Sequence, residues 1–149
     1  MIHTIKTEIK KVRENAILPR YATEGSAGAD LYACLEEEIT IASGDTFFVP
    51  SGVAISIPDG FVGLIFARSG LACKSGLAPA NKVGVIDSDY RGEIIVALHN
   101  HSSNSVSIKS GERIAQLVIM PYYQAEFAEV DELSSTERGK NGFGSTGNN

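Results

Sequence analysis

Two aspartates, an aromatic ring and an arginine are crowded into the stretch GVIDSDYRGEI, which spans residues 84–94. A carboxylate within hydrogen-bond reach of a water molecule can act as a general base, so Asp87 and Asp89 are candidates for catalysis. The same Asp-Ser-Asp run is also typical of an ordinary charged turn, because short polar side chains bond to their own backbone. The stretch alone does not decide between a catalytic loop and a hairpin tip.

The segment ARSGLA, residues 67–72, combines a cation with a small flexible backbone. Arg68 and Ser69 precede Gly70, and backbone N–H groups at such a turn can bind an anion. Tripeptides of this kind are common in turns, so the segment is a weak indication when taken alone.

Two predicted strands each contain one polar residue that could face a ligand. Asp30 enters the strand of SAGADLYA, and Gln116 interrupts the apolar strand of GERIAQLVI. A single polar residue in a strand more often faces solvent, so neither position indicates a site by itself.

The C-terminal stretch GFGSTG, residues 142–147, has the spacing G-x-G-x-x-G. A dinucleotide-binding loop with this spacing follows a strand and opens a helix within a βαβ unit. Only Asn148 and Asn149 follow here, so we expect no Rossmann-type helix. The chain also has no G-x-x-x-x-G-K-[ST] pattern.

The elements that must position these residues are predicted to be short strands. Apolar and β-branched runs recur between turn signals, at a spacing of roughly 8 to 12 residues that is typical of a sandwich or barrel. We expect strands at 7–12, 47–58, 61–67, 93–100, 105–111 and 113–120. The Pro58-Asp59-Gly60 turn predicts a hairpin between the second and third runs, and only a short piece after Ser69 could be helical. The predicted fold is an all-β, jelly-roll-like sandwich or barrel.

Residues 1–133 are expected to form this β domain, which carries the loops with candidate functional residues. From residue 134 the sequence SSTERGKNGFGSTGNN has one large apolar side chain, Phe143, and cannot bury a core. We therefore predict that residues 134–149 are a flexible glycine-rich C-terminal tail.

Composition excludes several classes of function. With 149 residues, 43% hydrophobic and 21% charged, the chain is typical of one globular domain. Its net charge of −5 argues against a general affinity for nucleic acid or an anionic membrane. The longest apolar run, residues 61–67, is too short to span a bilayer, and residues 1–15 lack an apolar signal region.

The cysteines and histidines do not suggest a metal site. Cys34 and Cys73 lack CxxC spacing, and we expect two buried, reduced thiols of a cytoplasmic protein, with a nuclear or viral setting left open. His99 and His101 are interpreted as the end of a strand that runs into a polar turn.

In order and spacing, five segments together resemble the five motifs of the trimeric dUTP pyrophosphatases (dUTPases). They are AGADLYA, ARSGLA, GVIDSDYRGEI, GERIAQLVI and RGKNGFGSTG, and they extend from Ala27 to Gly147. The resemblance implies a dUTPase-like fold and Mg²⁺-assisted attack of water on the α-phosphate of dUTP. The products would be dUMP and pyrophosphate, which limits uracil incorporation into DNA and supplies dUMP for dTMP synthesis. Two positions depart from the family pattern: Ala67 replaces a usual proline, and Asn141 a frequent glycine.

The resemblance also implies roles for the reacting groups. Asp87 would be the general base, with Asp89 shaping the turn. Asp30 would hold a Mg²⁺-bound water, as a contact one shell removed from the metal. The triphosphate would be bound by Arg68, Ser69, Gly70 and Gln116.

Specificity is implied for the segment around Asp87. Uracil would pair with the backbone of Gly84, Val85 and Ile86, with help from the Asn81 side chain. Tyr90 would pack against the deoxyribose, so that a ribose 2′-hydroxyl would collide with its ring.

The tail and the assembly complete what the resemblance implies. Phe143 would stack on uracil, Arg138, Ser145 and Thr146 would reach the γ-phosphate, and Gly144 belongs to the same substrate-binding set. The family is a homotrimer with three shared sites. One subunit would give the segments of Asp30, Arg68 and Gln116, a second the Asp87 hairpin and a third the tail.

Three other interpretations remain open at this stage. A dCTP deaminase on the related fold would need a glutamate in the base pocket, and its sequences lack the GFGSTG tail. A nucleotide-sensing protein would bind the nucleotide and signal to a partner, and hydrolysis would be a secondary activity. A plain β domain with a disordered tail would lose nothing when the tail is deleted.

Overall fold

A computed structural model describes residues 4–141 of the chain. Phe143, Gly144, Ser145 and Thr146 therefore lie outside the described residues. Within residues 4–141 the chain forms strands and one short helix, α1 (Ser69–Ser75). The strands are β1 (Glu8–Lys11), β2 (Arg20–Tyr21), β3 (Ala29–Tyr32), β4 (Ile39–Ile41), β5 (Thr46–Pro50), β6 (Val53–Ser56), β7 (Phe61–Phe66), β8 (Leu77–Pro79), β9 (Gly84–Ile86), β10 (Ile95–Asn100), β11 (Val106–Ile108) and β12 (Arg113–Pro121).

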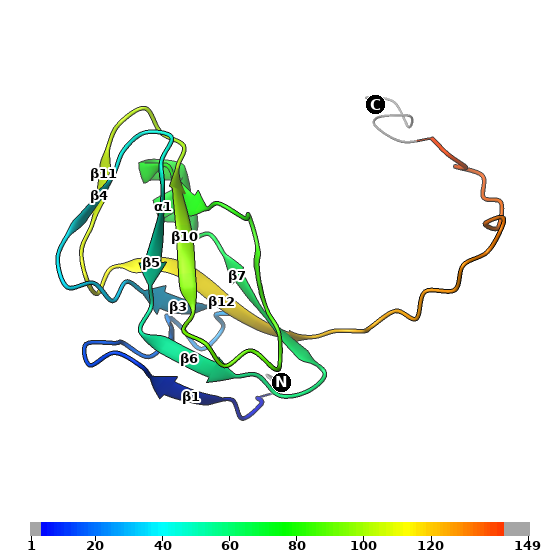
Figure 1. Ribbon diagram of the computed structural model, residues 1–149, viewed down its shortest axis with the longest axis horizontal. Coiled ribbons are helices and arrows are strands. Elements are labelled where there is room, and N and C mark those ends of the chain that lie inside the picture. The colour runs from blue at the N-terminus through cyan, green and yellow to red at the C-terminus, as the bar shows by residue number, and fades with distance from the viewer. Residues whose placement is uncertain (1–3, 142–149) are drawn as a thin grey trace.

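The all-β prediction is confirmed. The largest sheet has the order β2-β3-β12-β7-β9, and a second sheet has the order β5-β10-β8. β1 pairs with β6 and β11 with β4, and these ladders, like those of the two larger sheets, are antiparallel. Figure 1 shows β5 and β10 side by side, with β12 crossing behind them toward the lower edge of the molecule.

Alternating side chains explain how the sheets enclose a core. Along β10, Val96, Leu98 and Asn100 are buried while Ile95 is exposed, as expected for strands whose successive side chains point to opposite faces. β6 buries Val53 and Ile55 in the same way. The core is built almost entirely from aliphatic side chains, which leaves the polar residues of the loops free for other roles.

The predicted hairpin between residues 47–58 and 61–67 is wrong. The turn itself forms, because Gly60 has φ +81° and the Phe61 N–H donates to the Pro58 carbonyl at 3.1 Å. The strands on either side of it pair elsewhere, β6 with β1 and β7 with β12 and β9. The chain therefore changes sheet at this turn instead of folding back on itself.

The run expected at 47–58 is also divided. β5 ends at Pro50 and β6 begins at Val53, with Gly52 at φ +74° between them. A Cβ at Gly52 would lie 2.6 Å from Ala16 Cβ and 2.8 Å from Cys34 Sγ, so this corner has no room for a side chain.

The helical piece expected after Ser69 is confirmed as α1. It ends at Gly76, which has φ +73° and whose N–H donates to the Leu71 carbonyl, a typical glycine termination. Because β7 ends at Phe66, the chain makes its turn into α1 at Ala67 and Arg68.

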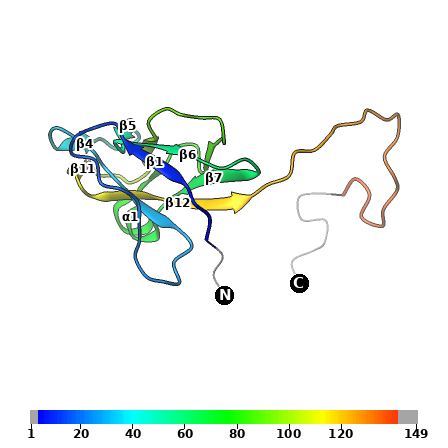
Figure 2. The same cartoon turned by 90° about the horizontal axis from the view of Figure 1, so that it is seen from below.

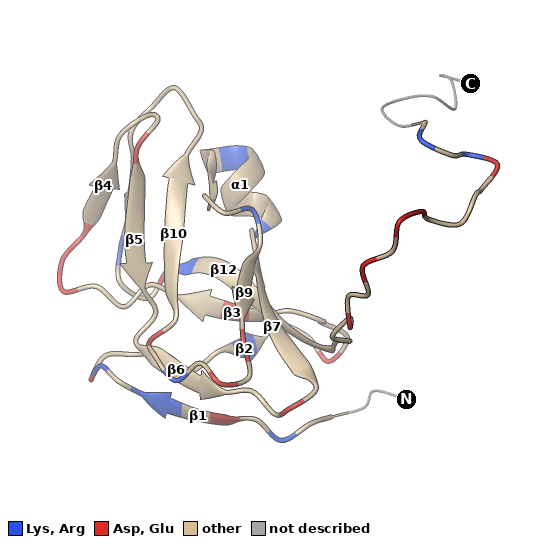
Figure 3. Cartoon of the chain, turned by 45° about the vertical axis from the view of Figure 1, so that its right-hand side comes forward, with Lys and Arg blue, Asp and Glu red and all other residues tan. Residues whose placement is uncertain are grey.

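We call residues 122–141 the arm. β12 ends at Pro121, and the arm leaves the β domain as an extended segment without strand or helix (Figures 1 and 2). Its aromatic side chains Tyr123 and Phe127 are 101% and 94% exposed. Acidic side chains follow one another along it and basic ones lie near its far end (Figure 3). The boundary expected at residues 133 and 134 falls inside this exposed segment.

Both cysteines are free, but only one is buried. Cys34 is buried as predicted, whereas Cys73 lies exposed on α1, so the prediction of a buried thiol there is wrong. The helix is short and presents this face to solvent, which its local sequence did not indicate. His99 lies near the end of β10 as expected, one residue before Asn100, and its Nδ1 lies 3.0 Å from Thr46 Oγ1. Within residues 4–141 no helix is long and apolar enough to cross a membrane.

Candidate functional site

One row of side chains across the largest sheet forms the floor of a cavity. Asp30 on β3 is the register partner of Gln116 on β12, and Gln116 is the partner of Phe66 on β7. Directly opposite residues on neighbouring strands project to the same face, so the three side chains line up. They border a cavity of about 370 Å³, which we call the Asp30 cavity. Its lining residues are Ala22, Ser26, Ala27, Gly28, Asp30, Phe66, Arg68, Ser69, Gly70, Arg113, Gln116 and Val118.

A bulge in β12 brings a second arginine into this cavity. The register shifts between Arg113 and Ala115, so Ile114 is an extra residue on that strand. In a regular strand Arg113 and Gln116 would project to opposite faces, because they are three positions apart, an odd number. The extra residue restores them to one face, and both line the cavity.

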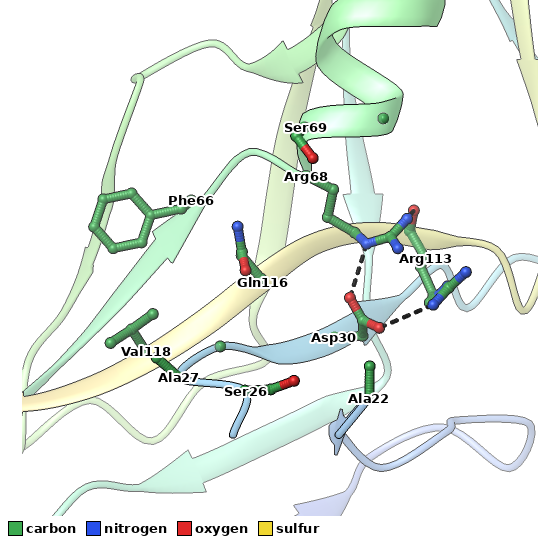
Figure 4. A pocket seen from close by; sticks show the side chains of 12 residues that line it. Ala22, Ser26, Ala27, Asp30, Phe66, Arg68, Ser69, Arg113, Gln116 and Val118 are labelled. Atoms are coloured by element: carbon green, nitrogen blue, oxygen red, sulfur yellow. Dashed lines mark hydrogen bonds and ion pairs between the residues drawn. The ribbon is translucent and has the colours of Figure 1, made fainter. Parts of the chain in front are cut away.

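Asp30 is held between two arginines (Figure 4). Its Oδ1 accepts from Arg68 Nε at 2.8 Å, and its Oδ2 accepts from Arg113 Nη1 at 3.3 Å. The Asp30 residue is 9% exposed, whereas the Arg113 side chain is 48% exposed. The cavity wall therefore carries two guanidinium groups and one carboxylate, a net positive charge suited to an anion.

The loop before α1 is fixed to the floor by Gln116. Its Nε2 donates to the Ala67 carbonyl at 2.9 Å, while a Cβ at Gly28 would lie 2.5 Å from its Oε1. Gly28 must therefore lack a side chain for Gln116 to keep this position. Gly70 differs, because no atom lies within 4 Å of the place where its Cβ would sit. Neither packing nor a positive φ within this chain explains the glycine at Gly70.

Asp87 lies on an exposed loop after β9. The Tyr90 N–H donates to the Asp87 carbonyl at 3.2 Å, and Arg91 Nη1 donates to the carbonyls of Ser88 and Tyr90, which closes a compact turn. The hairpin expected around Asp87 is wrong, since β9 pairs with β7 and the next strand, β10, pairs with β5 and β8. The loop is a connection between two sheets.

Asp87 and Tyr90 border one small cavity of about 180 Å³, which we call the Tyr90 cavity. Val85, Ile86, Glu93, Ile94 and Ile95 complete its lining. On its other side Asp87 also borders a larger hollow of about 660 Å³, together with Ser88, Asp89 and Tyr122.

The Tyr90 ring is anchored within its own loop. Its hydroxyl donates to the Glu93 carbonyl oxygen at 3.0 Å, and a Cβ on Gly92 would lie 2.6 Å from Tyr90 Cζ. The ring therefore lies against the bare backbone of Gly92. Nearby, Asn81 Nδ2 is 3.5 Å from where a Cβ would sit on Gly84, so the side chain expected to bind the base does lie beside β9.

The side chain of Glu93 ties this loop to the N-terminal segment. Arg13 Nε and Nη2 donate to its two oxygens at 2.7 and 3.0 Å, and the Gly52 N–H donates to Oε1 at 2.8 Å. The bond from Arg13 is the largest cause that holds the pKa of Glu93 below its usual value, against the opposing effect of partial burial. Glu93 is therefore a carboxylate at neutral pH.

The predicted site residues fall into two groups on this chain. Asp30, Arg68, Ser69, Gly70 and Gln116 meet in the Asp30 cavity. Val85, Ile86, Asp87 and Tyr90 meet in the Tyr90 cavity. The two linings have no residue in common.

The predicted residues of the tail stand apart from both cavities. Arg138 lies on the exposed arm, with its Nε donating to the Asn141 carbonyl at 3.0 Å. Phe143, Gly144, Ser145 and Thr146 lie outside the described residues.

Sequence reasoning missed three side chains of this site. Arg113 was visible in GERIAQ, but only the bulge shows that it shares a face with Gln116. Arg13 and Glu93 are 80 residues apart, and no local pattern links them. For Glu93 the available indication was its place within the polar stretch 84–94.

Protein side chains alone do not form a metal cage here. Among residues 4–141 no three His, Cys, Asp or Glu side chains are grouped so that they could hold a metal ion. Asp30 is a single carboxylate on the wall of a cavity suited to anions. That donor set fits a magnesium ion held mostly by phosphate oxygens and water, with one carboxylate nearby.

Comparisons with known proteins agree over nearly the whole chain. The family model described as dUTPase matches residues 14–147. The deoxyuridine 5′-triphosphate nucleotidohydrolase of Desulfitobacterium hafniense is 52% identical over 149 residues, covering 98% of this chain and 99% of that protein. The protein of the same name from Neisseria meningitidis serogroup A is 49% identical over 146 residues, covering 96% and 97%.

Solved structures give the same result. A mutant dUTPase of Staphylococcus bacteriophage 80alpha, determined with dUpNHpp, has a TM-score of 0.87 at 31% identity, covering 97% of this chain and 99% of that one. A mutant dUTPase from phage phi11 of S. aureus, reported with a structural Mg(II) ion, has a TM-score of 0.79 at 25% identity, covering 88% and 100%. The predicted resemblance to the dUTPase family is confirmed over nearly the whole chain.

Proposed function

The chain belongs to the dUTPase family, and on that premise we propose that it is a dUTP diphosphatase that splits dUTP into dUMP and pyrophosphate. The single observation that best supports this is the Asp30 cavity. It places Arg68, Ser69, Gly70 and Gln116 around one space, and these are the residues expected to bind a triphosphate.

The triphosphate is proposed to bind at the end of β7 and the start of α1. Arg68 provides a guanidinium, Ser69 a hydroxyl, and the first N–H groups of α1 have no partner within the helix. Gly70 lets a phosphate approach the backbone closely, which gives a reason for a glycine that no contact within the chain requires. Preset donors of this kind are worth roughly 3 to 4 kcal/mol each when charge develops in the transition state.

Asp30 is proposed to hold a magnesium ion through a bound water, while the phosphates supply the direct ligands. When bound, the ion would neutralise phosphate charge and orient the chain of phosphates for in-line attack. Arg113 lies on the other side of Asp30 and keeps that carboxylate directed at the cavity when Arg68 turns toward a phosphate.

Asp87 is proposed to take a proton from the water that attacks the α-phosphate. Its side chain is exposed on a loop whose shape is fixed by bonds from Tyr90 and Arg91. A carboxylate works as a base only when it is held within hydrogen-bond reach of the water, so this rigidity matters. Asp89, on the same turn, is proposed to shape the loop.

The Tyr90 cavity is proposed to select the base and the sugar. Backbone groups of Gly84, Val85 and Ile86 would pair with uracil, and Asn81 lies close enough to Gly84 to assist. A base with reversed donors and acceptors would leave buried polar groups unpaired, which is costly. The Tyr90 ring would obstruct a ribose 2′-hydroxyl.

The active site is proposed to be completed by neighbouring copies in a homotrimer. The Asp30 and Tyr90 cavities have separate linings on one chain, and the arm carries Arg138 away from both. A third copy would bring Arg138, Phe143, Gly144, Ser145 and Thr146 over the nucleotide. We further propose a cytoplasmic enzyme whose product dUMP supplies dTMP synthesis.

The test is pyrophosphate release from dUTP, UTP, dTTP and dCTP with the purified protein and Mg²⁺. We expect strong preference for dUTP, and Asp87→Asn is expected to lower kcat by at least about a hundredfold because the base is lost. Asp45→Asn is the matched control, since Asp45 is also an exposed aspartate outside the strands and lines neither cavity.

The outcomes separate the alternatives. Release of ammonia from dCTP would indicate a deaminase, and tight dUTP binding without turnover would indicate a nucleotide sensor. Full activity of Asp87→Asn would refute the assignment of the base.

A further inference from the structure

Glu93 is the most heavily bonded carboxylate outside the Asp30 cavity. Its carboxylate accepts a bidentate pair of hydrogen bonds from Arg13 and a third hydrogen bond from the Gly52 N–H, and its side chain is 17% exposed. Paired N–H donors of a guanidinium fix both the position and the plane of a carboxylate. The Glu93 side chain is therefore held in one orientation.

The backbone of the same residue carries the anchor of Tyr90. The Tyr90 hydroxyl donates to the Glu93 carbonyl oxygen at 3.0 Å, and its ring rests against Gly92. The next residue is fixed as well, because the Ile94 N–H donates to the Val53 carbonyl and the Ile94 carbonyl accepts from Ser51. The position of the Tyr90 ring is thus fixed by contacts with the backbone of residues 92–94. The position of residue 93 is fixed in turn by the ion pair of its side chain with Arg13.

Glu93 also borders the Tyr90 cavity beside Asp87. Two carboxylates on one small cavity repel each other unless one of them is neutralised. Arg13 neutralises Glu93, which leaves Asp87 as the carboxylate of that lining without an ion pair of its own among the described residues.

We propose that Arg13 and Glu93 are positioning residues that hold the Tyr90 ring against the sugar and so set the preference for dUTP over UTP. This inference rests on the proposed function and on the role of Tyr90 within it. Arg13 lies on the N-terminal segment, outside the five motifs, and acts through Glu93 without touching the nucleotide.

The experiment measures kcat/KM for dUTP and for UTP and compares their ratio among variants. The ratio cancels any general loss of active enzyme. We expect Arg13→Gln and Glu93→Gln each to lower it by roughly five- to tenfold, because a ring displaced by a fraction of an ångström no longer obstructs the hydroxyl. Arg13→Lys keeps the charge without the two-pronged geometry and is expected to recover part of the ratio.

A second set of variants tests whether Arg13 and Glu93 affect the ratio through Tyr90. Tyr90→Phe keeps the ring and removes the bond to the Glu93 carbonyl. If the pair acts by fixing that ring, the double variant Tyr90→Phe with Glu93→Gln is expected to have a ratio within about twofold of the ratio of Tyr90→Phe alone. If the two substitutions act independently, their fold-changes in the ratio multiply in the double variant, and that result would contradict the inference.

Matched controls come from the exposed pair Glu38 and Lys109, whose charged atoms are 3.6 Å apart. Glu38→Gln and Lys109→Gln make the same charge changes just before β4 and just after β11, and both are expected to leave the ratio unchanged. Thermal melting verifies that each variant is folded. If one of the glutamine variants does not fold, Arg13→Lys carries the test.

The results distinguish the inference from its premise. Ratios within about twofold of wild type in both glutamine variants, while Tyr90→Ala lowers the ratio, would overturn the positioning role and leave dUTP hydrolysis standing. A wild-type protein that does not hydrolyse dUTP would overturn the proposed function and this inference with it.

Discussion

At the scale of single residues, Asp30 shows how one carboxylate can organise a binding cavity. Each of its oxygens is occupied by a different guanidinium, from Arg68 on one side and Arg113 on the other. A phosphate offers Arg68 more negative charge than Asp30 does, so an incoming triphosphate can take over Arg68 while Arg113 retains the carboxylate. The ion pair with Asp30 therefore holds the Arg68 guanidinium at the cavity wall, next to the place where a phosphate would bind.

The ion pair of Glu93 with Arg13 predicts a pH-dependent stability. The pKa of Glu93 is below its ordinary value of 4.5, so the folded state binds this proton less tightly than the unfolded state does. The contribution is present above about pH 4.5 and is lost as the pH falls through the lower, folded pKa. Because the Arg13 side chain is 44% exposed, we expect only about 1 kcal/mol between wild type and Glu93→Gln at pH 7.

Thermal or urea unfolding of both proteins between pH 7 and pH 3 measures this difference. It should shrink as the pH falls below the ordinary pKa of a glutamate, because the unfolded state then takes up the proton more readily than the folded state does. A difference that stayed constant down to pH 3 would show that charge does not contribute. Glu38→Gln serves as the comparison, since its exposed pair should contribute little at any pH.

The family resemblance predicted the candidate site residues, and what it did not predict has physical reasons. Arg68, Ser69 and Gly70 are contiguous, so a local pattern could indicate them. Gln116 looks like an ordinary outward-facing residue until its register with Asp30 and Phe66 is known. Arg113 could not be assigned, because the bulge that turns it toward the cavity has no distinct mark in the sequence.

At the scale of elements, two glycines on and after β7 should behave in opposite ways. A Cβ at Gly63 would lie 2.6 Å from Ile57 Cδ1 and 3.2 Å from both Ile86 Cβ and Leu117 Cδ1, so Gly63→Ala is expected to destabilise by about 1–3 kcal/mol. Gly70 sits in α1 with open space around it, so Gly70→Ala should not lower the melting temperature.

Activity measurements should show the reverse order. Gly70→Ala is expected to lower dUTP turnover by about tenfold or more, because a methyl group would stand where a phosphate must approach. Folded Gly63→Ala should retain turnover at a temperature well below its melting point. A Gly70→Ala enzyme with wild-type kinetics would contradict the proposed phosphate site.

The longer strands were predictable, and their pairing was not. Apolar and β-branched runs at 113–120 and 93–100 indicated β12 and β10, whereas the short strands β2, β4, β8 and β9 were not predicted. The hairpin at Pro58 failed because a tight turn reports only local backbone geometry. Which sheet a strand joins depends on contacts far away in sequence, as the pairing of β6 with β1 shows.

At the scale of the whole molecule, the arm is predicted to serve activity and not stability of the fold. Residues 122–141 are exposed and none belongs to the core. Deleting Arg138–Asn149 should therefore leave the melting temperature and the oligomeric mass unchanged while dUTP turnover collapses. Calorimetry, light scattering and the pyrophosphate assay measure the three quantities. A truncated protein with full turnover would remove the tail from the mechanism.

Shared sites predict that two inactive variants can restore each other. Asp87→Asn damages the Tyr90 cavity, and Arg68→Ala damages the Asp30 cavity. If one copy supplies each cavity, random mixing leaves about one site in four with both residues intact. We expect turnover to reappear when the two variants are unfolded and refolded together. Turnover that merely equals the average of the separate variants would indicate that each chain forms its site alone.

The central place of β12 in the largest sheet also bears on how the protein is made. It lies between β3 and β7 and is the last strand within residues 4–141. A growing chain that has not yet emerged as far as Arg113 leaves both neighbours with unpaired backbone edges, which can join other chains. Incomplete translation products should therefore be prone to aggregate, and the Asp30 cavity forms only when synthesis is nearly finished.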